Sequence, residues 1–153
     1  MNGFIQVIMG TLGSFGFSVL FHVRGWKLLL ATLGGGLSWA LYLILEPVAP
    51  SEFTRYFFSA FFVAVYAEFF ARRLKTPATT FLIPSIIPHI PGGALYHTMR
   101  YALLKRWSDC FHQAFYTIKL ALGLALGIVA VLSILSVVEV VKKTVRQKKE
   151  NTP

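Results

Sequence analysis

Five long apolar runs, separated by short polar stretches, constrain this chain more than any other feature of its sequence. A helix needs about 20 mostly apolar residues to cross roughly 30 Å of hydrocarbon, so five crossings would use about 100 residues of the chain. The sequence therefore predicts an all-α integral membrane protein with about five transmembrane helices in a single domain, residues 1–141. The predicted spans are approximately 3–23, 28–45, 53–71, 79–99 and 118–141.

The composition excludes several other classes of protein. Apolar residues make up 56% of the 153 residues and charged residues only 14%, whereas soluble domains carry about 25% charged residues. The mean hydropathy of +0.64 also excludes a disordered chain, which would need low hydrophobicity. Cys110 is the single cysteine, so neither a disulfide framework nor a cysteine-based zinc site is expected. We predict no metal and no cofactor.

The net charge of +9 is best explained by membrane topology. The basic residues lie almost entirely between the apolar runs or after the last one, and no basic segment alternates with stacking aromatic residues, so nucleic-acid binding is not expected. Basic loops favour the cytoplasmic side of a membrane. This predicts an external N-terminus, an external loop carrying Glu46 and Glu52, and a basic cytoplasmic tail at residues 142–153.

The stretch after the fourth run does not fit this orientation, because it would place Arg100, Lys105 and Arg106 outside. One interpretation is that the basic tail outweighs these three residues. The other is that the fourth run is re-entrant, which would leave four crossings and an external tail. We favour five crossings.

Glycines at two places indicate close helix packing. Gly123 and Gly127 have the GxxxG spacing, and small residues let membrane helices approach one another closely. Gly34, Gly35 and Gly36 are consecutive, and each weakens a helix by about 1 kcal/mol. The triple glycine therefore allows two interpretations: tight packing, or a local unwinding that lines a cavity.

The fourth run is predicted to be a broken helix. Pro84, Pro88 and Pro91 each lack an amide proton and clash with the carbonyl four residues earlier, so those carbonyls should lose their helical partners. Gly92 and Gly93 are expected to supply the unusual backbone angles at which a second half-helix begins. Unpaired backbone groups cannot face lipid, so we expect them to line a cavity or to be buried against protein.

Broken helices of this kind form the substrate sites of many secondary transporters. The amides at a half-helix N-terminus can bind a carboxylate, and here those of Gly93, Ala94 and Leu95 are the expected donors. The alternative is a kinked structural helix, or a re-entrant loop, without a ligand. The candidate substrate-binding or translocation residues are Pro84, Pro88, Pro91, Gly92, Gly93, Ala94 and Tyr96.

Two titratable residues in the apolar runs are candidates for proton coupling or gating. Glu68 precedes Arg72 by four residues, the spacing of a helical ion pair, and a role in a proton relay or gate is the alternative. His89 could carry a coupled proton because histidine titrates near neutral pH, or it could simply form a cavity wall. No HExxH or GxSxG motif is present, so we predict no catalytic residues and no enzyme activity.

The proline-glycine segment resembles the signature of the threonine/serine exporter family, in the second membrane half of that family. The resemblance extends over nearly the whole chain, because the five-run layout and the glycine-rich first two runs also match. The matching residues are the stretch from Arg72 to Lys75 and then Pro77, Pro84, Pro88, Pro91, Gly92, Gly93 and Tyr96.

The resemblance implies a membrane subunit of a secondary exporter for small carboxylate-bearing metabolites, with threonine or serine as cargo. Some family members are split into two small subunits, and this chain is similar to the smaller subunit of the two-component succinate exporter. A second membrane subunit resembling the first half is therefore an expected partner, in a bacterial plasma membrane with the C-terminus in the cytoplasm. Succinate export is the alternative function. A non-transporting membrane scaffold or assembly subunit is the alternative of another class.

Overall fold

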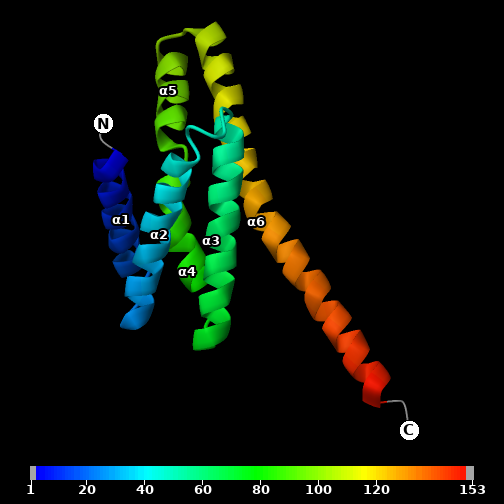
Figure 1. Ribbon diagram of the computed structural model, residues 1–153. Coiled ribbons are helices and arrows are strands. Elements are labelled where there is room, and N and C mark those ends of the chain that lie inside the picture. The colour runs from blue at the N-terminus through cyan, green and yellow to red at the C-terminus, as the bar shows by residue number, and fades with distance from the viewer. Residues whose placement is uncertain (1–2, 151–153) are drawn as a thin grey trace.

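The regular structure of the chain is entirely helical in the computed structural model, which describes residues 3–150 (Figure 1). No strand occurs within those residues, and the predicted all-α class is confirmed. The helices are α1 (Gly3–Leu20), α2 (Trp26–Ile44), α3 (Glu52–Leu74), α4 (Thr79–Ile86), the short 3₁₀-helix η1 (Ile87–His89), α5 (Gly92–Leu103) and α6 (Trp107–Glu150).

The helices run alternately up and down in Figure 1, and α4, η1 and α5 together form one broken ascending leg. This leg continues past its break without turning back, as the crossing interpretation of the fourth run predicts. Among the described residues, α1, α2 and residues Trp107–Lys142 of α6 are long and apolar enough to cross a membrane. The protein is thus an all-α membrane protein, and the full count of five crossings stays a prediction.

Predicted and observed boundaries agree closely for the first three helices and differ for the last. Each end of α1, α2 and α3 lies within three residues of the predicted span. By contrast, α6 begins at Trp107, well before the predicted start at residue 118, because no proline or glycine interrupts the helix there and Arg106 pairs with Asp109 at 2.7 Å in its first turn. It also continues to Glu150 through the predicted tail, whose residues 151–153 lie outside the described residues.

Both glycine groups serve close packing. A β-carbon added to Gly123 would lie 2.9 Å from the carbonyl oxygen of Phe53, and one on Gly127 would lie closer still to the carbonyl oxygen of Phe57, so α6 packs directly on the backbone of α3. The three glycines of α2 lie in a continuous helix, and the suggestion of a local unwinding there is wrong. Their missing side chains make room for residues of α1, α3 and α4.

Replacing Gly127 with alanine should lower the stability of the protein by about 1–3 kcal/mol, the usual range for overpacking. The added methyl group would meet the backbone of α3, which cannot rotate away as a side chain can. The matched control is Gly16→Ala, because a β-carbon at Gly16 meets open space and alanine is the better helix former. Melting temperatures in detergent measure both changes, and equal values for the two variants would contradict the close contact.

Two side-chain hydroxyl groups attach α2 to the first half of the broken leg and to α3. The Ser85 hydroxyl in α4 donates a hydrogen bond to the Ala31 carbonyl at 2.8 Å, and the Tyr66 hydroxyl in α3 donates one to the Leu30 carbonyl at 2.8 Å. Ser85 is fully buried. The Ser85 bond holds α4 against α2, and the Tyr66 bond holds α3 against α2. Because a buried hydroxyl without a partner is costly, the Ser85 bond helps to fix the position of the break.

Candidate functional site

The break in the fourth leg consists of one tight turn followed by two residues outside helical geometry. The chain tightens into η1, where the Ile90 amide donates to the Ile87 carbonyl at 3.0 Å. The expectation that the Ile87 carbonyl, four residues before Pro91, would lack a partner is therefore wrong, because a 3₁₀ turn supplies one. Ile90 is extended, with φ −63° and ψ 122°, and Pro91 has ψ 56°.

Gly92 and Gly93 form the first turn of α5 with ordinary negative φ angles. Gly25 is the one glycine with positive φ among the described residues, so the expectation of unusual backbone angles at Gly92 and Gly93 is wrong. Ile90 and Pro91 make the change of direction instead. A β-carbon added at Gly92 or Gly93 would meet open space, and the two glycines therefore leave the start of α5 uncovered.

Two of the three expected amide donors are free at this helix start. The Leu95 amide donates to the Pro91 carbonyl at 3.0 Å and so closes the first turn of α5. The amides of Gly93 and Ala94 make no hydrogen bond within the part of the chain that the structure describes. Unpaired amides at a helix N-terminus carry partial positive charge, which favours an anionic group.

A cavity of about 390 Å³ lies at the start of α5. Of the candidate residues from the sequence, it brings together Pro88, Pro91, Gly92, Gly93 and Ala94. The remaining lining comes from four helices and the break: Trp39 and Tyr42 of α2, Glu52 and Tyr56 of α3, Ile90, His97 of α5, and Gln113, Tyr116 and Leu120 of α6. The cavity thus lies near the end of α2 and the beginning of α3.

A charged cluster adjoins the cavity and reaches its lining through Glu52. The Tyr116 hydroxyl donates a hydrogen bond to Oε2 of Glu52, joining α6 to α3. The Arg55 guanidinium lies 3.9 Å from a Glu46 oxygen and 4.0 Å from Oε1 of Glu52, and it stacks over the Tyr42 ring at 5.2 Å. The Arg55 side chain is only 11% exposed. Two carboxylates share one guanidinium, so the cluster carries one net negative charge.

His89 lies behind the cavity wall. It is fully buried, and its ring meets those of Trp39, Tyr42 and Tyr56 edge-on at centroid distances of 5.3, 6.2 and 6.2 Å. The backbone of Ser38 lies near the ring, but neither ring nitrogen meets hydrogen-bond geometry with any described group. His89 is therefore separated from the cavity by three aromatic residues that line it.

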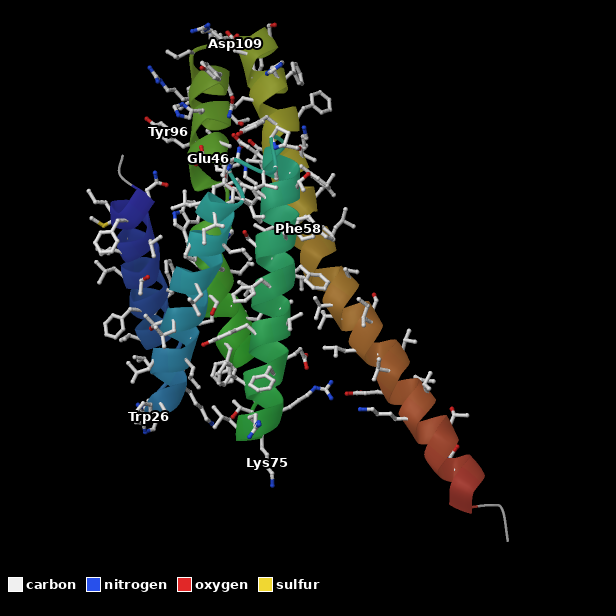
Figure 2. All side chains as sticks on the ribbon, viewed as in Figure 1. Trp26, Glu46, Phe58, Lys75, Tyr96 and Asp109 are labelled. Atoms are coloured by element: carbon white, nitrogen blue, oxygen red, sulfur yellow. The ribbon has the colours of Figure 1, made fainter. Side chains whose placement is uncertain are left out.

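Three other candidate residues lie away from the cavity. Pro84 is fully buried in α4. Tyr96 is 63% exposed and points outward from α5 (Figure 2), where it lines a separate groove. Glu68 lies toward the opposite end of α3 and pairs with Arg72 at 3.4 Å, which confirms the predicted ion pair.

Arg72 also joins α3 to α6 at the end of the bundle opposite the cavity. Its guanidinium donates to Oε1 of Glu139 at 2.6 Å, in addition to its contact with Glu68. Both partners of the longer-range pair are about half exposed. Helices α3 and α6 are thus connected by a polar contact at each end, Glu52–Tyr116 above and Arg72–Glu139 below, with Gly123 and Gly127 packed between them.

The sequence alone does not identify the lining residues that α3 and α6 contribute to the cavity. The predicted layout puts Glu52 in an external loop, and Gln113 and Tyr116 before the start of the last span. One local signal was available, because Glu52, Arg55 and Tyr56 place two opposite charges and a tyrosine on one face of the first turn of an apolar helix. Such charges in a span are functional candidates by default.

Comparison with known proteins gives a family for this arrangement. Residues 6–134 match the sequence model of a family described as "Threonine/Serine exporter, ThrE". No curated protein and no solved structure matched the chain. The family match extends from α1 into α6 and includes the broken leg and every residue that lines the cavity. The chain therefore belongs to the threonine/serine exporter family, a family of membrane transporters.

Proposed function

We propose that this chain is a membrane subunit of a secondary exporter for small carboxylate-bearing metabolites, and that the cavity at the break binds the cargo. The observation that supports this proposal most directly is the pair of free amides at Gly93 and Ala94, which belong to residues lining the cavity. Two amides at a helix N-terminus can hold a carboxylate by charge-assisted hydrogen bonds without any basic side chain.

The lining favours threonine or serine over succinate as cargo. Among the described residues, no lysine or arginine lines the cavity, whereas the Glu52 carboxylate does. A dicarboxylate would bring two negative charges toward that carboxylate with a single helix N-terminus to compensate them. An amino acid carries one carboxylate and one ammonium group, so its charges complement both the free amides and the Glu52 carboxylate. This supports the amino-acid class and makes succinate the weaker alternative.

The proposed orientation puts the cavity end of the bundle outside the cell. Figure 2 shows Glu46 toward the upper end of the bundle. Trp26 and Lys75, whose neighbours in the sequence include basic residues, lie at the lower end. The lower end is accordingly proposed to be cytoplasmic, together with the C-terminus, in a plasma membrane. A second membrane subunit, resembling the first half of the family, is proposed to complete the transport path.

A gating role is proposed for Glu68, and a proton-coupling role is proposed for His89. Glu68 shares Arg72 with Glu139, so a movement of α6 away from α3 would break one of the two contacts of Arg72. His89 lies in η1 and contacts aromatic rings of both α2 and α3, so a shift of the break would change its surroundings. A movement of α6 or of the break would therefore change the contacts of these two residues.

Efflux from loaded cells tests the proposed function. Cells that express this chain together with a first-half partner should lose preloaded threonine or serine several-fold faster than cells with either chain alone. Succinate, loaded in the same way, should leave at the background rate. Equal efflux of all cargoes from all three strains would contradict the transport function and favour a non-transporting scaffold.

A further inference from the structure

The cavity contains one acidic side chain whose role the transport proposal leaves open. Glu52 is the single carboxylate in the described cavity lining, and it is the first residue of α3. Resting on the proposed function, we propose that Glu52 is a specificity-determining residue that binds the ammonium group of the cargo. The free amides of Gly93 and Ala94, which line the same cavity, would hold the carboxylate of the same molecule.

One oxygen of Glu52 is available for this contact. Oε2 accepts the hydrogen bond from Tyr116. Oε1 faces the Arg55 guanidinium at 4.0 Å, which is beyond hydrogen-bond distance, and accepts no hydrogen bond from any residue that the structure describes. Tyr116 therefore fixes the orientation of the carboxylate while its second oxygen keeps free lone pairs. An ammonium group has three donors and no acceptor, so it matches an oxygen of this kind.

The charges around Glu52 favour a cation over an anion. Arg55 is shared between Glu46 and Glu52 at nearly equal distances, 3.9 and 4.0 Å, so neither carboxylate is fully compensated. One net negative charge remains in the cluster. A bound ammonium group would neutralise it, whereas a second anion would be repelled.

Aromatic residues complete the surroundings of the proposed ammonium site. Tyr42 and Tyr56 line the same cavity as Glu52, and their rings meet edge-on at 5.3 Å. The face of an aromatic ring attracts a cation, and this attraction is strongest where water is excluded. The Tyr42 ring already stacks with the Arg55 guanidinium at 5.2 Å and with Trp39 at 5.0 Å, so Tyr56 is the ring left for this contact. The Glu52 carboxylate can accept a hydrogen bond from an ammonium group and compensate its charge, whereas the hydroxyl group of a hydroxy acid supplies a hydrogen bond without a charge.

The test compares two cargoes that differ at one group. Serine and glycerate share a carboxylate and a hydroxymethyl group, but glycerate carries a hydroxyl group in place of the ammonium. The substitution Glu52→Gln keeps the size of the side chain and removes its charge. In cells with the partner subunit, it should lower the serine-to-glycerate efflux ratio about tenfold or more, which corresponds to one lost charge-assisted hydrogen bond.

Glu46→Gln is the matched control. It removes the same charge and the same kind of contact with Arg55, but Glu46 is absent from the cavity lining and its side chain is 64% exposed. This variant removes the net charge of the cluster but leaves the Glu52 carboxylate in the cavity lining, so it should lower the ratio by much less than Glu52→Gln does. An equal effect of both substitutions would show that only the total charge of the cluster matters, and it would overturn the assignment of Glu52.

A second variant keeps the proposal testable if Glu52→Gln fails to fold. Glu52→Asp keeps the charge and should retain a serine preference between those of the wild type and Glu52→Gln, with each amount of protein measured in the membrane. Complete loss of the preference in a folded Glu52→Asp variant would overturn the proposal, as would an equal decrease of both cargoes in Glu52→Gln. Absence of any efflux by the wild type would instead contradict the transport function itself.

Discussion

Replacing Gly93 with valine should reduce cargo efflux to less than about a tenth of the wild-type rate, while the protein still folds and inserts. A β-carbon at this position meets no other atom within 4 Å, and the backbone angles of Gly93 suit any L-residue. The valine side chain would therefore not disturb packing. It would instead enter the cavity beside the free amides, whose charge-assisted hydrogen bonds are worth about 1.5–3 kcal/mol each.

Gly16→Val is the control for this experiment. Gly16 also has open space around its missing side chain, but it lies on an exposed position of α1, away from the cavity. Both variants replace glycine by valine in a helix, so the change in helix propensity is common to them, whereas only Gly93→Val blocks the cavity. Efflux is measured from preloaded cells, with the amount of each variant in the membrane determined in parallel. Normal efflux by Gly93→Val would contradict a role of the Gly93 and Ala94 amides in transport.

The helices and the break could be predicted from the sequence because both depend on local chemistry. The lengths of the apolar runs determine where the first three helices begin and end. The prolines at 84, 88 and 91 interrupt the helix regardless of what the segment packs against. The exact backbone of the break could not be predicted in the same way. A chain with three prolines can restore its hydrogen bonds by a 3₁₀ turn, as at Ile87, and no unusual glycine angle is then needed.

The composition of the candidate site depended on contacts between distant residues. Glu52 and Tyr116 are 64 positions apart and meet only because Gly123 and Gly127 bring α6 onto α3. Prediction from the sequence is limited even within one helix, as the position of Tyr96 shows. It lies three residues after Gly93 on the same helix, yet it is 63% exposed and lines a different groove. Proximity in sequence to the break did not determine which face of α5 lines the cavity.

Replacing Arg55 with methionine should destabilise the protein by about 2 kcal/mol. Methionine keeps much of the apolar length that packs over Tyr42, but it leaves Glu46 and Glu52 without their shared positive charge. Breaking a fully buried ion pair costs about 3–5 kcal/mol, and an exposed pair contributes about 0–1 kcal/mol. The guanidinium is nearly buried and the carboxylates are 64% and 38% exposed, so an intermediate value is expected. Thermal unfolding in detergent measures it.

A second substitution separates the charge effect from the loss of packing. Adding Glu46→Gln to Arg55→Met returns the cluster to one net negative charge, so the double variant should recover about half of the lost stability. Glu46→Gln alone should have little effect, because Arg55 then pairs with Glu52 only. Such non-additivity is expected only for residues that share one network. Additive effects of the two substitutions would mean that Arg55 acts through its packing on Tyr42, and that Glu52 is not held in a charge-coupled cluster.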